Sequence, residues 1–257
     1  MFYKLTNRLR YFIELSYNGK NFHGWQYQPN AMSVQQTIEK SLEILLKQKI
    51  KILGAGRTDT GVHAKQMYAH FDFDEPIDLE NLIYKLNAFL NKDIGIANIH
   101  KVRHNSHARF DAISREYEYY ITQIKDVYNH DKKYFFSKKL DFDKIDKAID
   151  ILKNTKNFKS FCRTKSDVTN YNCEIFDFNY EIKESEIIFR IRANRFLRNM
   201  VRSLIGTILD VSLNKISIKN LTEIIEKSNR IYAGPSVTAH ALFLSNVEYP
   251  KNVFLDE

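Results

Sequence analysis

The order of strand and helix patterns in the first hundred residues most constrains the fold of this chain. Residues 10–17 alternate apolar and polar side chains, as a half-buried strand does. Apolar residues then recur at helical spacing over 34–49, after Ser33 and Gln36, which form a capping box. Two further strands, a second amphipathic helix and another strand are predicted at 50–53, 67–73, 79–90 and 94–102. This order predicts helices packed on a mainly antiparallel sheet.

The second half of the chain shows similar patterns without a repeated sequence. Strands and helices are predicted at 116–124, 145–152, 174–182, 186–193, 197–208, 218–227 and 241–249. The charged segment 125–139 has no period and is interpreted as a mobile insertion or linker. The prediction is an α+β fold with two similar α/β halves, 1–105 and 106–257. Their mainly antiparallel sheets join into one central sheet with a basic cleft, and helices cover the outer face.

Charge and composition indicate the kind of partner. Lys and Arg number 39 against 31 Asp and Glu, which gives a formal charge of +8 and favours a polyanion such as nucleic acid. A bias toward AT-rich codons is the alternative explanation. No apolar run reaches the ~18 residues that span a membrane, and no signal-peptide pattern precedes residue 9, so a cytoplasmic location is expected. Cys162 and Cys173 have no metal-ligand spacing and are predicted to be free thiols.

A glycine-rich loop between two predicted strands is the best candidate for chemistry. Three glycines within residues 54–61 permit close approach to the backbone, and Asp59 and Arg57 lie among them. Opposite charges on an exposed loop are usually structural, although loops also carry function more often than the core does. The sequence of the loop alone leaves both interpretations open.

Three other site classes fit the loop and its neighbours poorly. Asp59-Thr60-Gly61 is the tripeptide of aspartic proteases, but those need two aspartates that share a proton away from strong positive charge, and Arg57 lies two residues away. A phosphate-binding P-loop requires Gly-Lys-Ser/Thr after its glycines, which this chain lacks. The histidines form no recognised metal-ligand pattern.

Arginines concentrate in the second half, where five occur within thirteen residues: Arg190, Arg192, Arg195, Arg198 and Arg202. At 100° per residue, Arg198 and Arg202 are predicted to lie together beside the apolar stripe of one helix. A solvated helix flank is the simpler interpretation. In a chain rich in lysine, however, this concentration of arginine favours bidentate contacts to phosphate or carboxylate.

Six ordered motifs together resemble the tRNA pseudouridine synthase A family. The central one is GRTDTGVHA at 56–64, followed by Gln66 and by HFD at 70–72. The others are YNG with FHGWQYQ at 17–28, SVQ at 33–35, HARFDA with REYEY at 107–119, SFCR at 160–163 and FLRNMVR at 196–202. Two positions depart from the family pattern: Thr60 replaces a usual alanine, and residues 237–242 replace Ala-Pro followed by His-Gly-Leu.

The resemblance implies an activity and roles for individual residues. The family isomerises uridine to pseudouridine at positions 38, 39 and 40 of tRNA, without cofactor or metal, as a homodimer. Asp59 matches the catalytic aspartate and Tyr117 the tyrosine that packs on the target base. Arg57 and Arg202 match basic residues near the acid, and Arg195 and Arg198 are further substrate-binding candidates. Whether Asp59 attacks the sugar, attacks the ring or acts as a base stays open.

An RNA-binding protein that remodels tRNA without modifying it is the competing hypothesis. Basic and aromatic residues would serve either function. A pure binder gains nothing from a carboxylate that faces a polyanion, because like charges repel. Asp59 within an otherwise intact motif therefore favours catalysis.

Overall fold

The computed structural model describes residues 8–164 and 168–255 and divides the chain into two compact units. The first contains the residues up to Ile113 together with those from Leu244 onward, and the second is Ser114–Phe243. These bounds differ from the predicted halves, 1–105 and 106–257. Residues 106–113 belong to the first unit because they bond to its strands, and the last strand returns to it over a long separation in sequence. Helices and strands occur in both units, and the predicted α+β class is confirmed.

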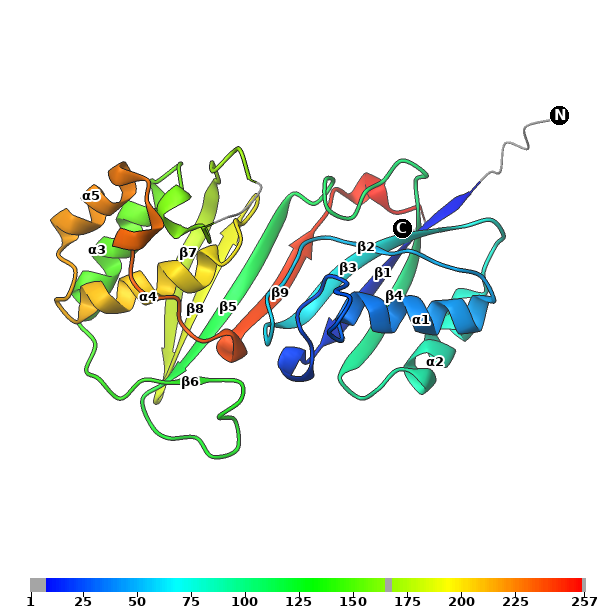
Figure 1. The fold of residues 1–257 in the computed structure, drawn as a ribbon, viewed down its shortest axis with the longest axis horizontal. Coiled ribbons are helices and arrows are strands. Elements are labelled where there is room, and N and C mark those ends of the chain that lie inside the picture. The colour runs from blue at the N-terminus through cyan, green and yellow to red at the C-terminus, as the bar shows by residue number, and fades with distance from the viewer. Residues whose placement is uncertain (1–7, 165–167, 256–257) are drawn as a thin grey trace. The chain divides into compact units, whose positions relative to one another are not determined.

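The first unit is built on a sheet in the order β4-β1-β3-β9 (Figure 1). Its strands are β1 (Leu9–Tyr17), β3 (His63–Phe73), β4 (Ile94–Val102) and β9 (Leu242–Glu248), and the short β2 (Leu53–Gly54) pairs with β3. β1 is antiparallel to both β3 and β4. Apolar side chains of β1 lie in the core, where Phe12, Ile13 and Leu15 are fully buried. The predicted strands in this half are confirmed, although β2 begins later and β3 earlier than expected.

Two helices complete the first unit, α1 (Val34–Leu46) and α2 (Leu79–Phe89). The Ser33 hydroxyl accepts a hydrogen bond from the Gln36 amide at 3.2 Å, as the predicted cap requires. α1 ends before the predicted residue 49 because Lys47 adopts a left-handed conformation with φ 54°. α2 contacts both α1 and β4.

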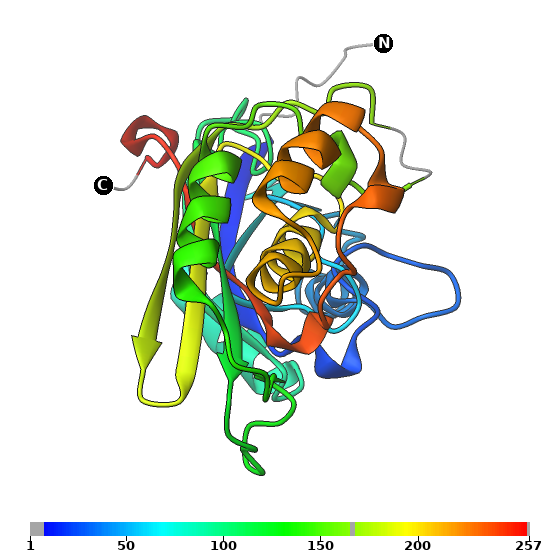
Figure 2. The same ribbon diagram turned by 90° about the vertical axis from the view of Figure 1, so that its left-hand side faces the viewer.

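The second unit is built on strands in the order β5-β8-β7, together with α-helices. The strands are β5 (Ser114–Thr122), β7 (Ile175–Lys183) and β8 (Glu186–Ala193), and both pairings are antiparallel. The helices are α3 (Phe142–Lys153), α4 (Met200–Ser212) and α5 (Ile218–Lys227). In Figure 2, α3 runs alongside β7, and it also contacts α4 and α5. Short 3₁₀ helices occur at 19–21, 159–161, 230–232, 239–241 and 251–253.

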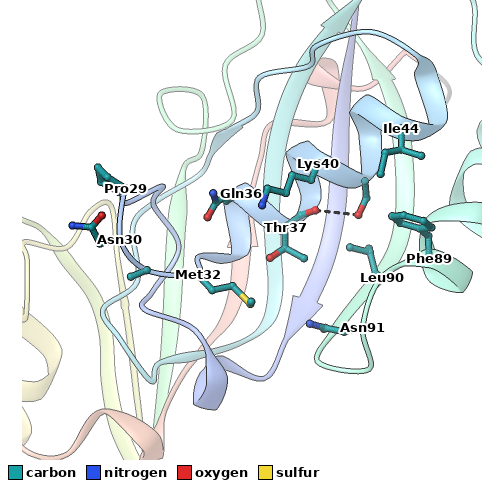
Figure 3. Close-up of a pocket in the computed structure, with 12 residues that line it drawn as sticks. Pro29, Asn30, Met32, Gln36, Thr37, Lys40, Ile44, Phe89, Leu90 and Asn91 are labelled. Carbon is teal, nitrogen blue, oxygen red and sulfur yellow. Dashed lines mark hydrogen bonds between the residues drawn. The ribbon is translucent and has the colours of Figure 1, made fainter.

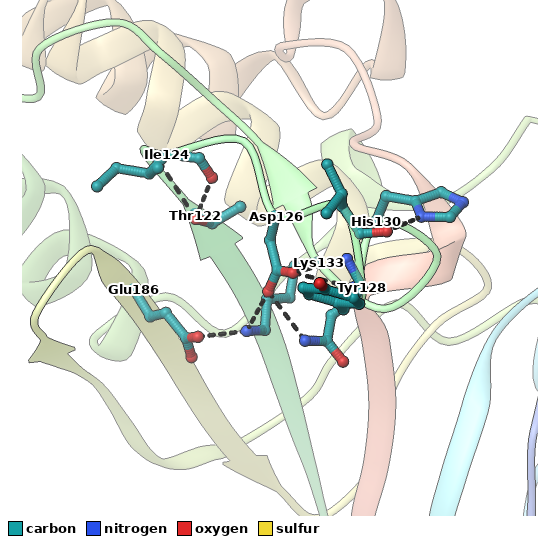
Figure 4. A network of polar contacts seen from close by, with 9 residues as sticks. Thr122, Ile124, Asp126, Tyr128, His130, Lys133 and Glu186 are labelled. Carbon is teal, nitrogen blue, oxygen red and sulfur yellow. Dashed lines mark hydrogen bonds and ion pairs between the residues drawn. The ribbon is translucent and has the colours of Figure 1, made fainter.

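Residues 125–139, which are predicted to be a mobile insertion or linker, contain structure that no periodic pattern predicts. The segment contains β6 (Tyr134–Phe135), which is parallel to β5, and an organised turn before it. The Asp126 carboxylate accepts hydrogen bonds from the Lys133 ammonium and the Asn129 amide, both at 2.9 Å, and Lys133 also pairs with Glu186 of β8 (Figure 4). The segment is held by charged side chains, which carry no periodic signal in a sequence.

A pocket of about 620 Å³ lies on the outer side of α1 and α2 (Figure 3). It is bounded by the turn at 29–32, by α1 residues such as Thr37 and Ile44, and by Phe89 at the end of α2. None of the predicted site residues lines it. Among the helices of the described residues, none is long and apolar enough to cross a membrane.

Candidate active site

The loop between β2 and β3 ends in a tight turn that begins at Asp59. The Asp59 carbonyl accepts a hydrogen bond from the Val62 amide at 3.1 Å. Gly61, the third residue of this turn, has φ +79°, which glycine adopts without strain. Thr60 occupies the second position and is exposed, so a side chain larger than alanine fits there.

The residue before Asp59 is fixed from two sides. The Thr58 carbonyl accepts from the Trp25 amide at 3.2 Å, and the Thr58 hydroxyl is 2.8 Å from the Tyr17 hydroxyl. Thr58 is buried, whereas Asp59 is half-buried and Arg57 is exposed. The loop therefore turns Thr58 into the core and leaves the two charged residues accessible to a ligand.

Close backbone approach holds the segment at 19–25 against this loop. A β-carbon on Gly24, which has φ +85°, would lie 2.4 Å from the Thr58 carbonyl oxygen. A β-carbon on Gly19 would lie 2.0 Å from the Val62 carbonyl oxygen, and the Gly19 amide donates to Nδ1 of buried His63 at 3.1 Å. Only glycine permits these contacts.

Thr58 and His63 position the loop, and sequence reasoning assigned neither residue a role. No local pattern in the sequence indicates that the segment at 19–25 meets residues so distant in the chain. Trp25, which lies in the segment beside the loop, is a core residue: it is 2% exposed and its ring packs on Gly54.

Tyr117, the predicted stacking residue, lies on β5 in the second unit. It is half-buried, and its ring meets the Phe196 ring edge-on at a centroid distance of 5.1 Å. Its neighbour on the same strand face, Tyr119, is 1% exposed, and its hydroxyl donates to the Thr238 carbonyl at 3.1 Å. Of the two tyrosines, Tyr119 belongs to the core and Tyr117 presents part of its ring.

The predicted pairing of Arg198 and Arg202 on one helix flank is wrong. α4 begins at Met200, and the preceding Asn199 has the left-handed φ of 65°. The Asn199 side chain donates to the Ser236 hydroxyl at 2.6 Å, which stabilises this break. Arg195 and Arg198 therefore lie in the connection between β8 and α4, and only Arg202 is on the helix.

Arg202 is oriented by the segment that departs from the family pattern. Its Nε donates to the Val237 carbonyl at 2.7 Å, and the Val237 amide donates to the Arg202 carbonyl at 3.1 Å. Just before this segment, Pro235 packs tightly on α4, because a β-carbon on Gly206 would lie 1.7 Å from the Pro235 carbonyl oxygen. The Val237 carbonyl therefore orients the guanidinium of Arg202.

A second loop of the first unit, residues 103–113, is tied to β3 through His70. Nδ1 of His70 accepts a hydrogen bond from the Ala108 amide at 3.2 Å, so the ring is neutral when the bond forms. Burial, with smaller effects of His107 and Arg10, lowers the pKa of His70 from 6.5 to about 4. Asp72 and Asp111 oppose this shift, and Arg10 binds Asp72 through two hydrogen bonds of 2.6 and 2.8 Å.

We expect this histidine to make stability depend on pH. Between pH 6.5 and 4 the unfolded chain binds a proton at His70 that the native protein does not. The contribution of His70 to the free energy of unfolding is therefore complete above about pH 6.5 and falls toward pH 4. One proton corresponds to a slope of at most about 1.4 kcal/mol per pH unit. Urea unfolding at pH 7.5 and 5 measures this change in the free energy of unfolding with pH. The slope should be smaller in His70→Asn, and an equal slope in the variant would contradict the assignment.

Among residues 8–164 and 168–255, no three His, Cys, Asp or Glu side chains are placed to hold a metal ion.

A family model and similar known proteins both indicate one family. Residues 15–111 and 148–250 match the family model described as tRNA pseudouridine synthase. A relative from Parabacteroides distasonis named tRNA pseudouridine synthase A is 49% identical over 95% of this chain and 98% of its own length. A relative of the same name from Bacteroides fragilis is 44% identical over 95% of this chain and 98% of its own length. Another from Bacillus subtilis is 36% identical over 91% of this chain and 97% of its own length. On these matches, the chain belongs to the tRNA pseudouridine synthase family.

Proposed function

We propose that this chain isomerises uridine to pseudouridine at positions 38, 39 and 40 in the anticodon stem-loop of tRNAs, with Asp59 as the catalytic residue. The relatives named tRNA pseudouridine synthase A, at 36% to 49% identity over nearly the whole chain, support the reaction and the tRNA substrate. One structural observation carries the assignment to Asp59: the buried Thr58 beside it and the turn at 59–62 fix its backbone, while Asp59 itself is only half-buried.

The reaction moves uracil from one bond to another on the same ribose. The bond from C1′ to N1 breaks, a bond from C1′ to C5 forms, the hydrogen on C5 leaves to water as a proton, and N1 takes up a proton from water. A carboxylate can promote this either as a nucleophile or as a base, and Asp59 can serve in both ways. Entry of a base removes water from the carboxylate and favours its neutral form, whereas a nearby guanidinium favours the charged form. We assign this supporting role to Arg57.

The target base must leave its helical stack before it reaches a carboxylate on a protein loop. Extrusion costs a few kcal/mol. Stacking on an aromatic ring contributes about 1–3 kcal/mol per base, and we assign this role to Tyr117, whose ring is partly accessible. Arg195, Arg198 and Arg202 are proposed to bind the phosphates of the distorted backbone. A homodimer and a cytoplasmic location complete the proposal and rest on the family resemblance.

Release of tritium from C5 of uridine tests the proposed reaction. A tRNA transcript labelled at C5 is incubated with the wild-type protein, and tritium in water is measured over time. Because the new bond forms at C5, each turnover must release that hydrogen. Stable binding of the labelled transcript without any release would instead identify a tRNA-binding protein that does no chemistry.

We expect Arg198→Ala to weaken tRNA binding and to reduce its salt dependence. A lost phosphate contact lowers the slope of log affinity against log salt by about 0.7 to 0.9. Filter binding between 50 and 300 mM KCl measures this slope. Arg198→Lys keeps the charge and is the matched control, so it should retain the wild-type slope. The same slope for Arg198→Ala and wild type would show that this guanidinium meets no phosphate.

A further inference from the structure

The loop at 103–113 is held rigidly although it lies at the surface. Besides the bond from Ala108 to His70, the Ala108 carbonyl accepts from the Tyr249 hydroxyl, and the Ser106 carbonyl accepts from Arg10 at 2.8 Å. The His107 amide donates to the Asp111 carboxylate at 2.7 Å. The backbone on both sides of residues 109 and 110 is therefore fixed.

This rigid loop presents an aromatic ring to solvent. Phe110 is 73% exposed, and its ring centroid lies 4.3 Å from that of His107. The His107 ring in turn lies 4.5 Å from the buried His70 ring. Three rings thus lead from the core to the surface, and Phe110 is the outermost. Single exposed aromatic residues are ordinary; Phe110 is distinguished by the fixed backbone and the ring contacts beneath it.

The charges around Phe110 suit an anionic ligand. The guanidinium carbon of Arg109 is 5.6 Å from the centre of the Phe110 ring, and Arg103 in the same loop is exposed. The acidic residue of the loop, Asp111, is engaged by the His107 amide, and Asp72 is bound by Arg10. An aromatic face beside guanidinium groups is the combination that binds an unpaired base together with its phosphate.

We propose that Phe110 is a second stacking platform, which binds an unpaired base of the tRNA outside the catalytic position, with Arg109 beside it for the adjoining phosphate. The proposal rests on the proposed function for its ligand, and it adds a contact that the isomerisation itself does not require. A preordered ring loses little conformational freedom on binding, so the stacking energy is retained as affinity.

Substitutions of Phe110 test the platform through the affinity for an unmodified tRNA transcript. Phe110→Ala should weaken binding by about 5- to 150-fold, the equivalent of 1–3 kcal/mol per stacked base. Phe110→Leu keeps an apolar side chain but loses the ring face, so a comparable loss is expected. Phe110→Tyr should bind within about 2-fold of wild type. The slope of log affinity against log salt should be the same in all three variants as in wild type, because the ring carries no charge.

A fluorescent variant reports stacking directly. Trp25 is the only natural tryptophan and is 2% exposed, so Phe110→Trp adds a single accessible tryptophan. Its emission should be quenched on addition of tRNA. Tyr84→Ala is the control for the affinity measurements, because Tyr84 is 74% exposed on α2 of the same unit, and this variant should bind like wild type.

Three results would each overturn the platform: wild-type affinity in Phe110→Ala, wild-type affinity in Phe110→Leu, or an equal loss in Tyr84→Ala. Thermal unfolding of each variant checks the fold, and retained binding by Phe110→Tyr shows that the loop is intact. The tritium assay separates this proposal from the proposed function. If the wild-type protein releases tritium but substitution of Phe110 leaves tRNA affinity unchanged, only the platform is rejected. If substitution of Phe110 weakens tRNA binding but the wild-type protein releases no tritium, only the isomerisation is rejected.

Discussion

Asp59→Asn will lose tritium release from C5-labelled tRNA by at least about 100-fold, the lower range for loss of a positioned acid or base, while tRNA binding is retained. The amide has the size of the carboxylate but supplies neither a nucleophilic oxygen nor a base. The fold should tolerate it, since the backbone carbonyl of Asp59 closes the turn and asparagine leaves that carbonyl in place. Binding should stay equal or become tighter, because one negative charge facing a polyanion is removed.

Release and binding must be measured on the same tRNA preparation. Asp143→Asn is the control, since Asp143 is exposed in the first turn of α3 and has no proposed role. That variant should release tritium at the wild-type rate. Equal release by Asp59→Asn and wild type would remove Asp59 from the mechanism, whatever the motif around it.

Gly24→Ala is expected to lower kcat/KM by about 100-fold without touching any group that reacts. Its β-carbon would lie 2.4 Å from the Thr58 carbonyl oxygen, at a φ of +85° that alanine adopts only with strain. Either the segment at 19–25 or the loop with Asp59 must move, and a displacement near 1 Å in an active site costs about 10²-fold in rate. Tritium release at several tRNA concentrations measures the change.

Gly56→Ala provides a matched control within the loop itself. A β-carbon on Gly56 meets no atom within 4 Å, so this variant should retain wild-type turnover. Thermal unfolding separates a displaced loop from global destabilisation of Gly24→Ala. Wild-type activity in both variants would show that the contact between Gly24 and Thr58 does not position Asp59.

Local patterns predicted most helices and strands because their causes lie within a few residues. The Ser33 cap and the apolar period after it located α1, and β4 and α5 have the predicted bounds. Two features that no local pattern predicted depend on single residues. Asn199 in a left-handed conformation removed Arg198 from the helix, and Lys133 ordered a segment that has no periodic signal.

Residue identities alone determined the α+β class, the set of ordered motifs and the choice of Asp59, because periodicity and motif spacing are properties of the linear chain. Only the tertiary structure decided how Asp59 is held and which tyrosine stays accessible. Gly24 meets Thr58, Gly19 meets Val62, and Tyr119 is buried while Tyr117 is not. These contacts join residues far apart in sequence, and their geometry follows from how whole strands and loops pack, which no local pattern encodes.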